Sequence, residues 1–142
     1  MGFFNRFKKA SPPPEVPRAQ TPQAYEEPDE APQAMPQVPE LPVEELKARL
    51  ERGEQPLIID VREQWEYDLV HLPQARLIPM NTIPEHVDEL DKDAEIVLHC
   101  HHGARSWSVA AYLMQHGFSN VKNLTGGIDA WARRVEPGMR TY

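Results

Sequence analysis

The residues best suited to chemistry surround the only cysteine of the chain, in the run Ile96-Val97-Leu98-His99-Cys100-His101-His102-Gly103-Ala104-Arg105-Ser106. An apolar segment ends at Cys100, and a helix is expected to begin at Arg105 or Ser106. Such a strand would bring Cys100 to the carboxyl edge of a sheet, where open α/β folds bind their ligands. The first N–H groups of the helix and the nearby cations would favour the thiolate form of the sulfur. Cys100 is therefore predicted to be a nucleophile rather than a buried structural cysteine.

The spacing between Cys100 and Arg105 limits the size of the group that this loop can hold. The pattern C-x4-R predicts a short turn whose N–H groups converge on a single sulfur atom bonded to Cys100. A tetrahedral phosphate needs a wider ring, and the phosphotyrosine-phosphatase signature H-C-x5-R is one residue longer. An arsenate reductase or a small phosphatase would use the same thiolate and stays as the less favoured alternative.

Five motifs, in order along the chain, resemble the rhodanese-like sulfurtransferases in their single-domain form. The resemblance extends over about 41–134, and five ordered motifs are more specific than any one of them. The loop carries two histidines where arginine or small polar residues are frequent in the family. The five motifs are Asp60-Val61-Arg62-Glu63 with Trp65-Glu66-Tyr67, His71-Leu72-Pro73, Ile78-Pro79, Cys100 to Ser106, and Gly117-Phe118 to Gly126-Gly127-Ile128 and Trp131.

The resemblance implies a thiosulfate sulfurtransferase-like enzyme that works through a persulfide on Cys100. A sulfane sulfur would pass from a donor such as thiosulfate to cyanide, glutathione or a protein thiol, and no cofactor is implied. A sulfur-carrier or binding module without thiosulfate turnover is the alternative. The residues expected to bind the substrate and the persulfide are His101, His102, Gly103, Ala104, Arg105 and Ser106.

Three charged residues near this loop have more than one possible role. Arg105 would either supply positive charge for an anionic donor or brace the loop. Asp60 stands at a strand end and is expected to be a structural acceptor more than a general base, and Arg62 is expected to pair with carboxylates. Both are predicted to support the site. No metal site is predicted, because consecutive histidines do not easily converge on one tetrahedral ion and a second cysteine is absent from the sequence.

Strand and helix patterns alternate after Leu41, which predicts an α/β fold. With the resemblance, they predict a rhodanese-like three-layer fold: a mostly parallel five-stranded sheet with helices on both faces. Strands are expected over 57–60, 76–79, 95–99 and 121–123. Helices are expected over 43–52, 63–69, 82–90, 105–116 and 127–134. A capping box, Thr82-Ile83-Pro84-Glu85, is expected to open the third of these helices.

Residues 1–40 differ in composition from the rest of the chain and hold nine of its 15 prolines. This density predicts a disordered Pro-rich N-terminal arm, followed by one rhodanese-like domain over 41–142. Phe3, Phe4 and Phe7 stand beside three cations and could contact an anionic membrane surface or a partner, although a frayed tail is the favoured interpretation.

Charge and cysteine content exclude several other classes. The formal net charge of -7 argues against nucleic acid as a partner. No stretch approaches the apolar length that a transmembrane helix needs, and the continuous apolar core of a secretory signal is missing. A lone cysteine cannot form an internal disulfide, so a cytoplasmic location is expected.

Overall fold

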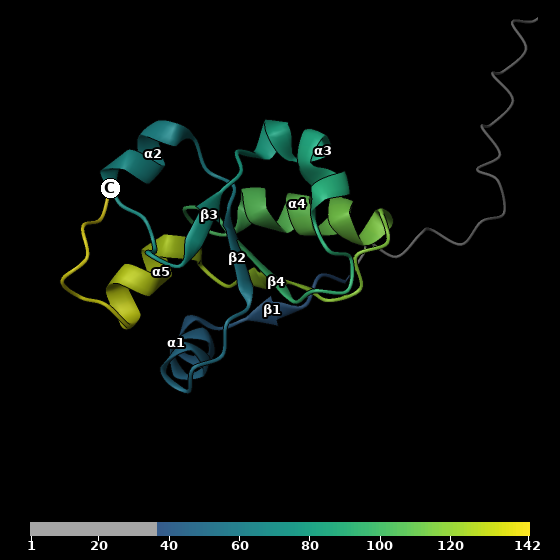
Figure 1. Cartoon of the computed structure of the whole chain (residues 1–142). Helices are drawn as coiled ribbons and strands as arrows, with labels where there is room; N and C mark the ends of the chain where they lie inside the picture. The colour runs from purple at the N-terminus through teal and green to yellow at the C-terminus, as the bar shows by residue number, and fades with distance from the viewer. Residues whose placement is uncertain (1–36) are drawn as a thin grey trace, which may run out of the picture. The chain divides into compact units, whose positions relative to one another are not determined.

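A computed structural model describes residues 37–142, so residues 1–36 of the predicted arm, with its three phenylalanines, lie outside the described residues. Five strands form one sheet in the order β1-β5-β4-β2-β3, and every neighbouring pair is parallel. Helices cover both faces, which confirms the predicted α/β fold (Figure 1). The strands are β1 (Glu40–Leu41), β2 (Leu57–Asp60), β3 (Ala75–Leu77), β4 (Ile96–His99) and β5 (Val121–Leu124). The helices are α1 (Val43–Glu51), α2 (Gln64–Leu69), α3 (Ile83–His86), α4 (Ala104–Gln115) and α5 (Gly127–Arg134).

Strand β4 lies in the middle of the sheet and presents alternate residues to its two faces. Ile96 and Leu98 pack in one hydrophobic cluster with α3 and α4, whereas Val97 packs in the other with α1 and α5. Side chains of a strand alternate in this way, and here both faces are covered, so Ile96, Val97 and Leu98 are all apolar. The strand is held on both sides, and its carboxyl end delivers Cys100 to a fixed position.

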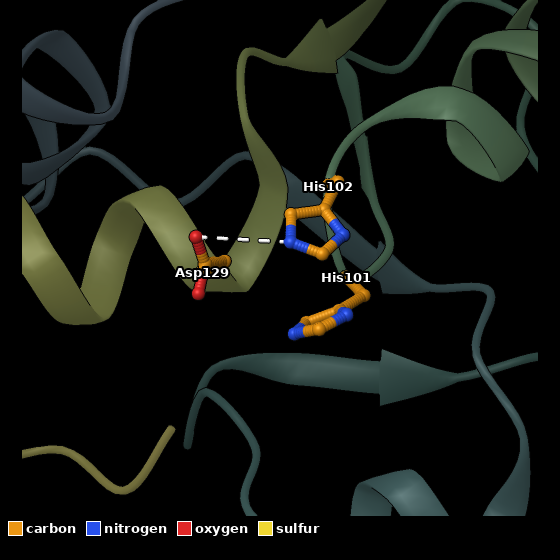
Figure 2. Close-up of side chains that lie close together, drawn as sticks. All are labelled: His101, His102 and Asp129. Carbon is orange, nitrogen blue, oxygen red and sulfur yellow. Dashed lines mark ion pairs between the residues drawn. The ribbon is translucent and has the colours of Figure 1, made fainter. Parts of the chain in front are cut away.

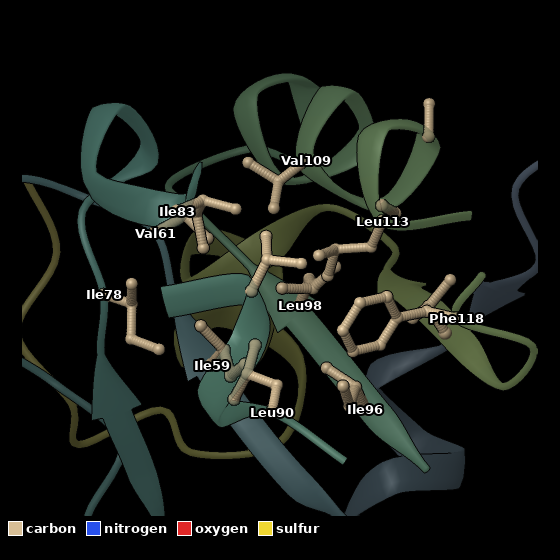
Figure 3. Packing of buried hydrophobic residues seen from close by; sticks show 14 of the residues in the cluster. Ile59, Val61, Ile78, Ile83, Leu90, Ile96, Leu98, Val109, Leu113 and Phe118 are labelled. Atoms are coloured by element: carbon tan, nitrogen blue, oxygen red, sulfur yellow. The ribbon is translucent and has the colours of Figure 1, made fainter. Parts of the chain in front are cut away.

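The cluster under α4 forms the larger part of the core (Figure 3). Val109 and Leu113 face the sheet from α4, and they pack with Ile59 and Leu98 from the two central strands. Leu98, Ile59 and Leu113 are completely buried. Because burial of such a side chain stabilises a fold by about 1.5–3 kcal/mol, this cluster anchors the helix that follows the Cys100 loop.

The segment expected to form one helix over 82–90 is divided into three short turns. A 3₁₀ turn over Met80–Thr82 precedes α3, and another over Val87–Glu89 follows it. The predicted capping box is wrong: Thr82 has helical backbone angles and its hydroxyl donates to the Pro79 carbonyl at 2.8 Å. An N-cap residue needs an extended backbone to reach the third N–H of its helix.

Strand β1 is the fifth strand, for which the sequence pattern indicated no position. Its two residues pair with β5, and Val38 before it is buried. A two-residue strand is too short to show an alternating pattern. Since β1 includes Glu40, the last residue assigned to the arm from the sequence, the folded region begins before Leu41. Within residues 37–142, no helix combines the length and the apolar character needed to cross a membrane.

Candidate active site

Cys100 directly follows β4, and only 1% of its surface is exposed. Helix α4 begins at Ala104, one residue before the expected start, so the connecting loop consists of residues 101–103. The sulfur accepts a hydrogen bond from the Gly103 N–H at 3.1 Å, and the Ser106 hydroxyl lies 3.3 Å from it. Gly103 has a φ of 111°, which side chains with a Cβ rarely adopt. The tight turn therefore directs the Gly103 N–H at the sulfur, where it stabilises negative charge.

The amino end of α5 holds the backbone of the same loop. The Ile128 N–H donates to the Cys100 carbonyl at 2.9 Å, and the Asp129 N–H donates to the His101 carbonyl at 3.0 Å. A Cβ at Gly127 would collide with both carbonyl oxygens, and its φ is 61°. Gly127 is thus explained by the close approach of α5 to the cysteine loop, whereas Gly126 has a φ of 77° and a Cβ there would collide with Ala130 of α5.

Ser106 connects the sulfur to a buried polar chain that sequence reasoning missed. Its hydroxyl lies 2.5 Å from Asn123 Oδ1 on β5. The amide of Asn123 donates to the Gly103 carbonyl and to Glu40 Oε1, each at 3.1 Å. The loop that carries Cys100 is therefore tied to the edge of the sheet through β5 and β1.

Arg105 does not point at the sulfur as a free cation but forms a two-pronged ion pair with Glu66 of α2. Its Nη1 and Nη2 donate to the two carboxylate oxygens at 2.7 and 2.9 Å. The Tyr142 hydroxyl donates to the same carboxylate at 2.6 Å. The hydrogen bonds from Arg105, with that from Tyr142, lower the pKa of Glu66 to about 2. Glu66 and Tyr142 are not among the site residues predicted from the sequence, although Glu66 belongs to one of the five motifs.

Asp60 and Arg62 form a fully buried pair behind the loop. Arg62 Nε donates to Asp60 Oδ1 at 2.9 Å, and Nη2 donates to Oδ2 at 2.7 Å. Arg62 Nη1 donates to the Tyr142 hydroxyl at 2.8 Å. Both side chains therefore reach the loop indirectly, through Tyr142 and Glu66. His99 lies 3.7 Å from Asp60, and burial lowers its pKa.

The two loop histidines lie on the outer side of the site (Figure 2). The ring of His101 stacks on Tyr142 at 4.1 Å between centroids, and burial together with the nearby His102 lowers the pKa of His101. His102 Nε2 lies 3.8 Å from Asp129 Oδ2. The structure thus brings the predicted loop residues together around Cys100 and places their charged partners on α2 and α5.

Comparison with known proteins gives one consistent result. Residues 42–134 match the family of the Rhodanese-like domain. A protein named sulfurtransferase from Allochromatium vinosum is 43% identical over 100 residues, which cover 70% of this chain and 94% of the relative. The thiosulfate sulfurtransferase GlpE of Pseudomonas fluorescens is 35% identical, with 64% of this chain and 82% of the relative covered. The crystal structure of a rhodanese-like domain protein from Staphylococcus aureus is 31% identical, covers 74% of this chain and 99% of its own, and has a TM-score of 0.65.

Proposed function

This chain belongs to the rhodanese-like domain family, and we propose that it is a sulfurtransferase whose Cys100 carries the transferred sulfur as a persulfide. The observation that carries this proposal is the hydrogen bond from the Gly103 N–H to the buried Cys100 Sγ, in the turn that opens α4. Donors aimed at a site of developing charge stabilise it strongly when water is excluded. A thiolate nucleophile and a persulfide anion both place that charge at or beside this sulfur.

Thiosulfate is the proposed donor, as in the name of the Pseudomonas relative. The Cys100 thiolate attacks the outer sulfur of thiosulfate. A bond forms between Sγ and that sulfur while the bond to the central sulfur breaks, and sulfite leaves with the electron pair. Since Cys100 is only 1% exposed, the outer sulfur enters the loop and the rest of the donor stays outside.

The acceptor is proposed to be cyanide, glutathione or a protein thiol. It attacks the outer sulfur of the persulfide, and Cys100 leaves as a thiolate. Cyanide becomes thiocyanate, whereas a thiol loses its proton and becomes a persulfide. The two half-reactions balance without an external oxidant or reductant.

We assign two roles to the residues around Cys100: some surround the transferred sulfur, and others hold the loop in position. The backbone from His101 to Ser106 surrounds the transferred sulfur, and Ser106 holds the loop to β5 because its hydroxyl donates to Asn123 Oδ1. Arg105 is proposed to brace the loop against α2, because both of its outer nitrogens are engaged by Glu66. Asp60 and Arg62 support this brace through Tyr142.

The proposal is tested by the formation of thiocyanate from thiosulfate and cyanide. We expect Cys100→Ser to abolish turnover while the protein stays folded, because an alcohol is not ionised at neutral pH and is a poor sulfur nucleophile. Ser108→Ala is the matched control, since Ser108 lies exposed on α4 and bonds only its own helix. Turnover by the Cys100→Ser variant would contradict the proposal. Efficient hydrolysis of aryl phosphates by the unaltered protein would contradict the argument from loop size.

We also propose the cytoplasm as the place of action. Cys100 is the only cysteine and is a free thiol. A reducing compartment keeps such thiols available for reaction. Fractionation of cells that express the full chain tests this location.

A further inference from the structure

One cluster of side chains near Cys100 has no role in the proposed sulfur transfer. It consists of His101, His102 and Asp129. One nitrogen or oxygen of each residue lies within 4.8 Å of those of the other two. Figure 2 shows that both imidazole rings approach the carboxylate from the same side. Adjacent residues usually diverge, but the loop turns sharply at Gly103 and α5 supplies the third group from another part of the chain.

His101 has an imidazole nitrogen that lacks a partner. Its Nε2 is buried and makes no hydrogen bond to any of the residues that the structure describes. The ring is held against Tyr142, with an angle of 12° between the two planes. Buried polar atoms without a hydrogen-bond partner are rare in folded proteins, so this nitrogen is a candidate to bind a ligand.

Asp129 supplies the negative charge that a divalent cation needs. Its oxygens accept hydrogen bonds from Arg133 Nε at 3.1 and 3.0 Å. The side chain of Arg133 is 65% exposed, and ion pairs of this kind contribute little to stability. Asp129 can therefore turn one oxygen to an ion, and the 67% exposed side chain of His102 is free to adjust toward it.

We propose that His101, His102 and Asp129 bind a divalent cation of the zinc class at the edge of the Cys100 loop. Two imidazole nitrogens and one carboxylate oxygen are a common ligand set for Zn²⁺ with one position left open. Around such an ion the ligand atoms stand roughly 3.3 Å apart, as bonds of about 2.0–2.2 Å require. Movements of about one ångström close the cluster from its present spacing. The bound ion adds positive charge to the loop that carries Cys100.

The test is a titration of the full chain with Zn²⁺ in competition with a chromophoric chelator. We expect one Zn²⁺ per chain, and we expect His102→Ala and Asp129→Asn each to weaken its binding by roughly tenfold or more. His116→Ala is the matched control, because this exposed histidine bonds only the carbonyl of Tyr112 in its own helix. Cys100→Ser and His116→Ala are expected to bind Zn²⁺ as the unaltered chain does.

Three results would overturn the proposal. The first is the lack of any Zn²⁺ binding in the micromolar range, and the second is unchanged affinity in the His102→Ala variant. The third is loss of binding in Cys100→Ser with retention in His102→Ala, which would make the thiolate the ligand. The readout is binding alone, so its failure leaves the proposed sulfur transfer untouched.

Discussion

Arg105 lies in the first turn of α4, directly after the cysteine loop, yet its guanidinium is engaged by Glu66. Such a pair fixes the orientation of the first turn of α4 and leaves less positive charge for an anionic donor. We expect Arg105→Ala to lower kcat/KM for thiosulfate by roughly tenfold to a hundredfold, the scale of about 1.5–3 kcal/mol for a charge-assisted hydrogen bond. A bracing role predicts that the loss lies mainly in kcat.

Steady-state kinetics separate bracing from donor binding. Arg76→Ala is the matched control, because Arg76 makes a surface pair with Glu89 at 3.4 Å, away from the loop. A loss confined to KM for thiosulfate would show that Arg105 binds the donor. Kinetics equal to those of the control would remove Arg105 from the site altogether.

Glu66 provides a pH test of the same brace. Its pKa is about 2 in the folded protein against an ordinary value of 4.5, chiefly because of the hydrogen bonds from Arg105. A carboxyl with a depressed pKa stabilises the fold fully above its unfolded pKa and loses this contribution as the pH falls through the folded pKa. We expect Glu66→Gln to be less stable than the unaltered chain at pH 7, with the difference shrinking as the pH falls from 4.5 toward 2. Denaturant unfolding at a series of pH values measures it, and a difference that does not change with pH would contradict this assignment.

The position of the cysteine loop could be predicted from the sequence, but the partners of its side chains could not. Cys100 and its loop form one continuous run whose strand and helix flanks are visible in the pattern of residues. Glu66 lies 39 positions from Arg105, and Tyr142 lies 76 positions from Glu66. Contacts between residues so far apart in the chain depend on the order in which the strands pair in the sheet. The spacing of residues along the sequence does not specify that order.

At the scale of helices and strands, the packing of α5 on the cysteine loop is the most specific contact. Gly127 allows it, because any Cβ there would meet the carbonyls of Cys100 and His101. We expect Gly127→Ala to destabilise the fold by about 1–3 kcal/mol or more and to lower the rate of sulfur transfer. Thermal unfolding and thiocyanate formation measure the two effects.

Gly53→Ala separates the cost of crowding from the cost of backbone strain. Gly53 has a φ of 86°, but a Cβ there would have open space around it. This variant should therefore bear only the penalty of a positive φ, on the order of 1 kcal/mol. Equal losses in the two variants would mean that the α5 contact is not specific.

The predicted elements agree with the structure where the apolar pattern of a segment is clear. Helices α1 and α4 each bury one face, β4 is buried on both faces, and each of the three lies within a residue of its expected bounds. The prediction was wrong over 82–90, where two 3₁₀ turns flank a single turn of α-helix.

At the scale of the whole molecule, β1 joins the residues before Leu41 to the active site. Glu40 accepts hydrogen bonds from Asn123 and from the Thr125 hydroxyl, and Val38 is buried beside the core. We expect deletion of residues 1–36 to leave stability and thiosulfate turnover unchanged. Deletion of residues 1–40 should lower the unfolding temperature and the rate, because it removes an edge strand and a partner of Asn123. Equal behaviour of both truncated chains would show that β1 contributes nothing to the site.

Intact-mass measurement shows directly whether Cys100 takes up a single sulfur atom. The full chain is incubated with thiosulfate, freed of excess donor and weighed beside the Cys100→Ser variant. We expect the mass of the unaltered chain to rise by that of one sulfur atom and to return to its first value when cyanide is added. The mass of the variant should not change. An unchanged mass of the unaltered chain, or an equal gain in the variant, would contradict the proposal.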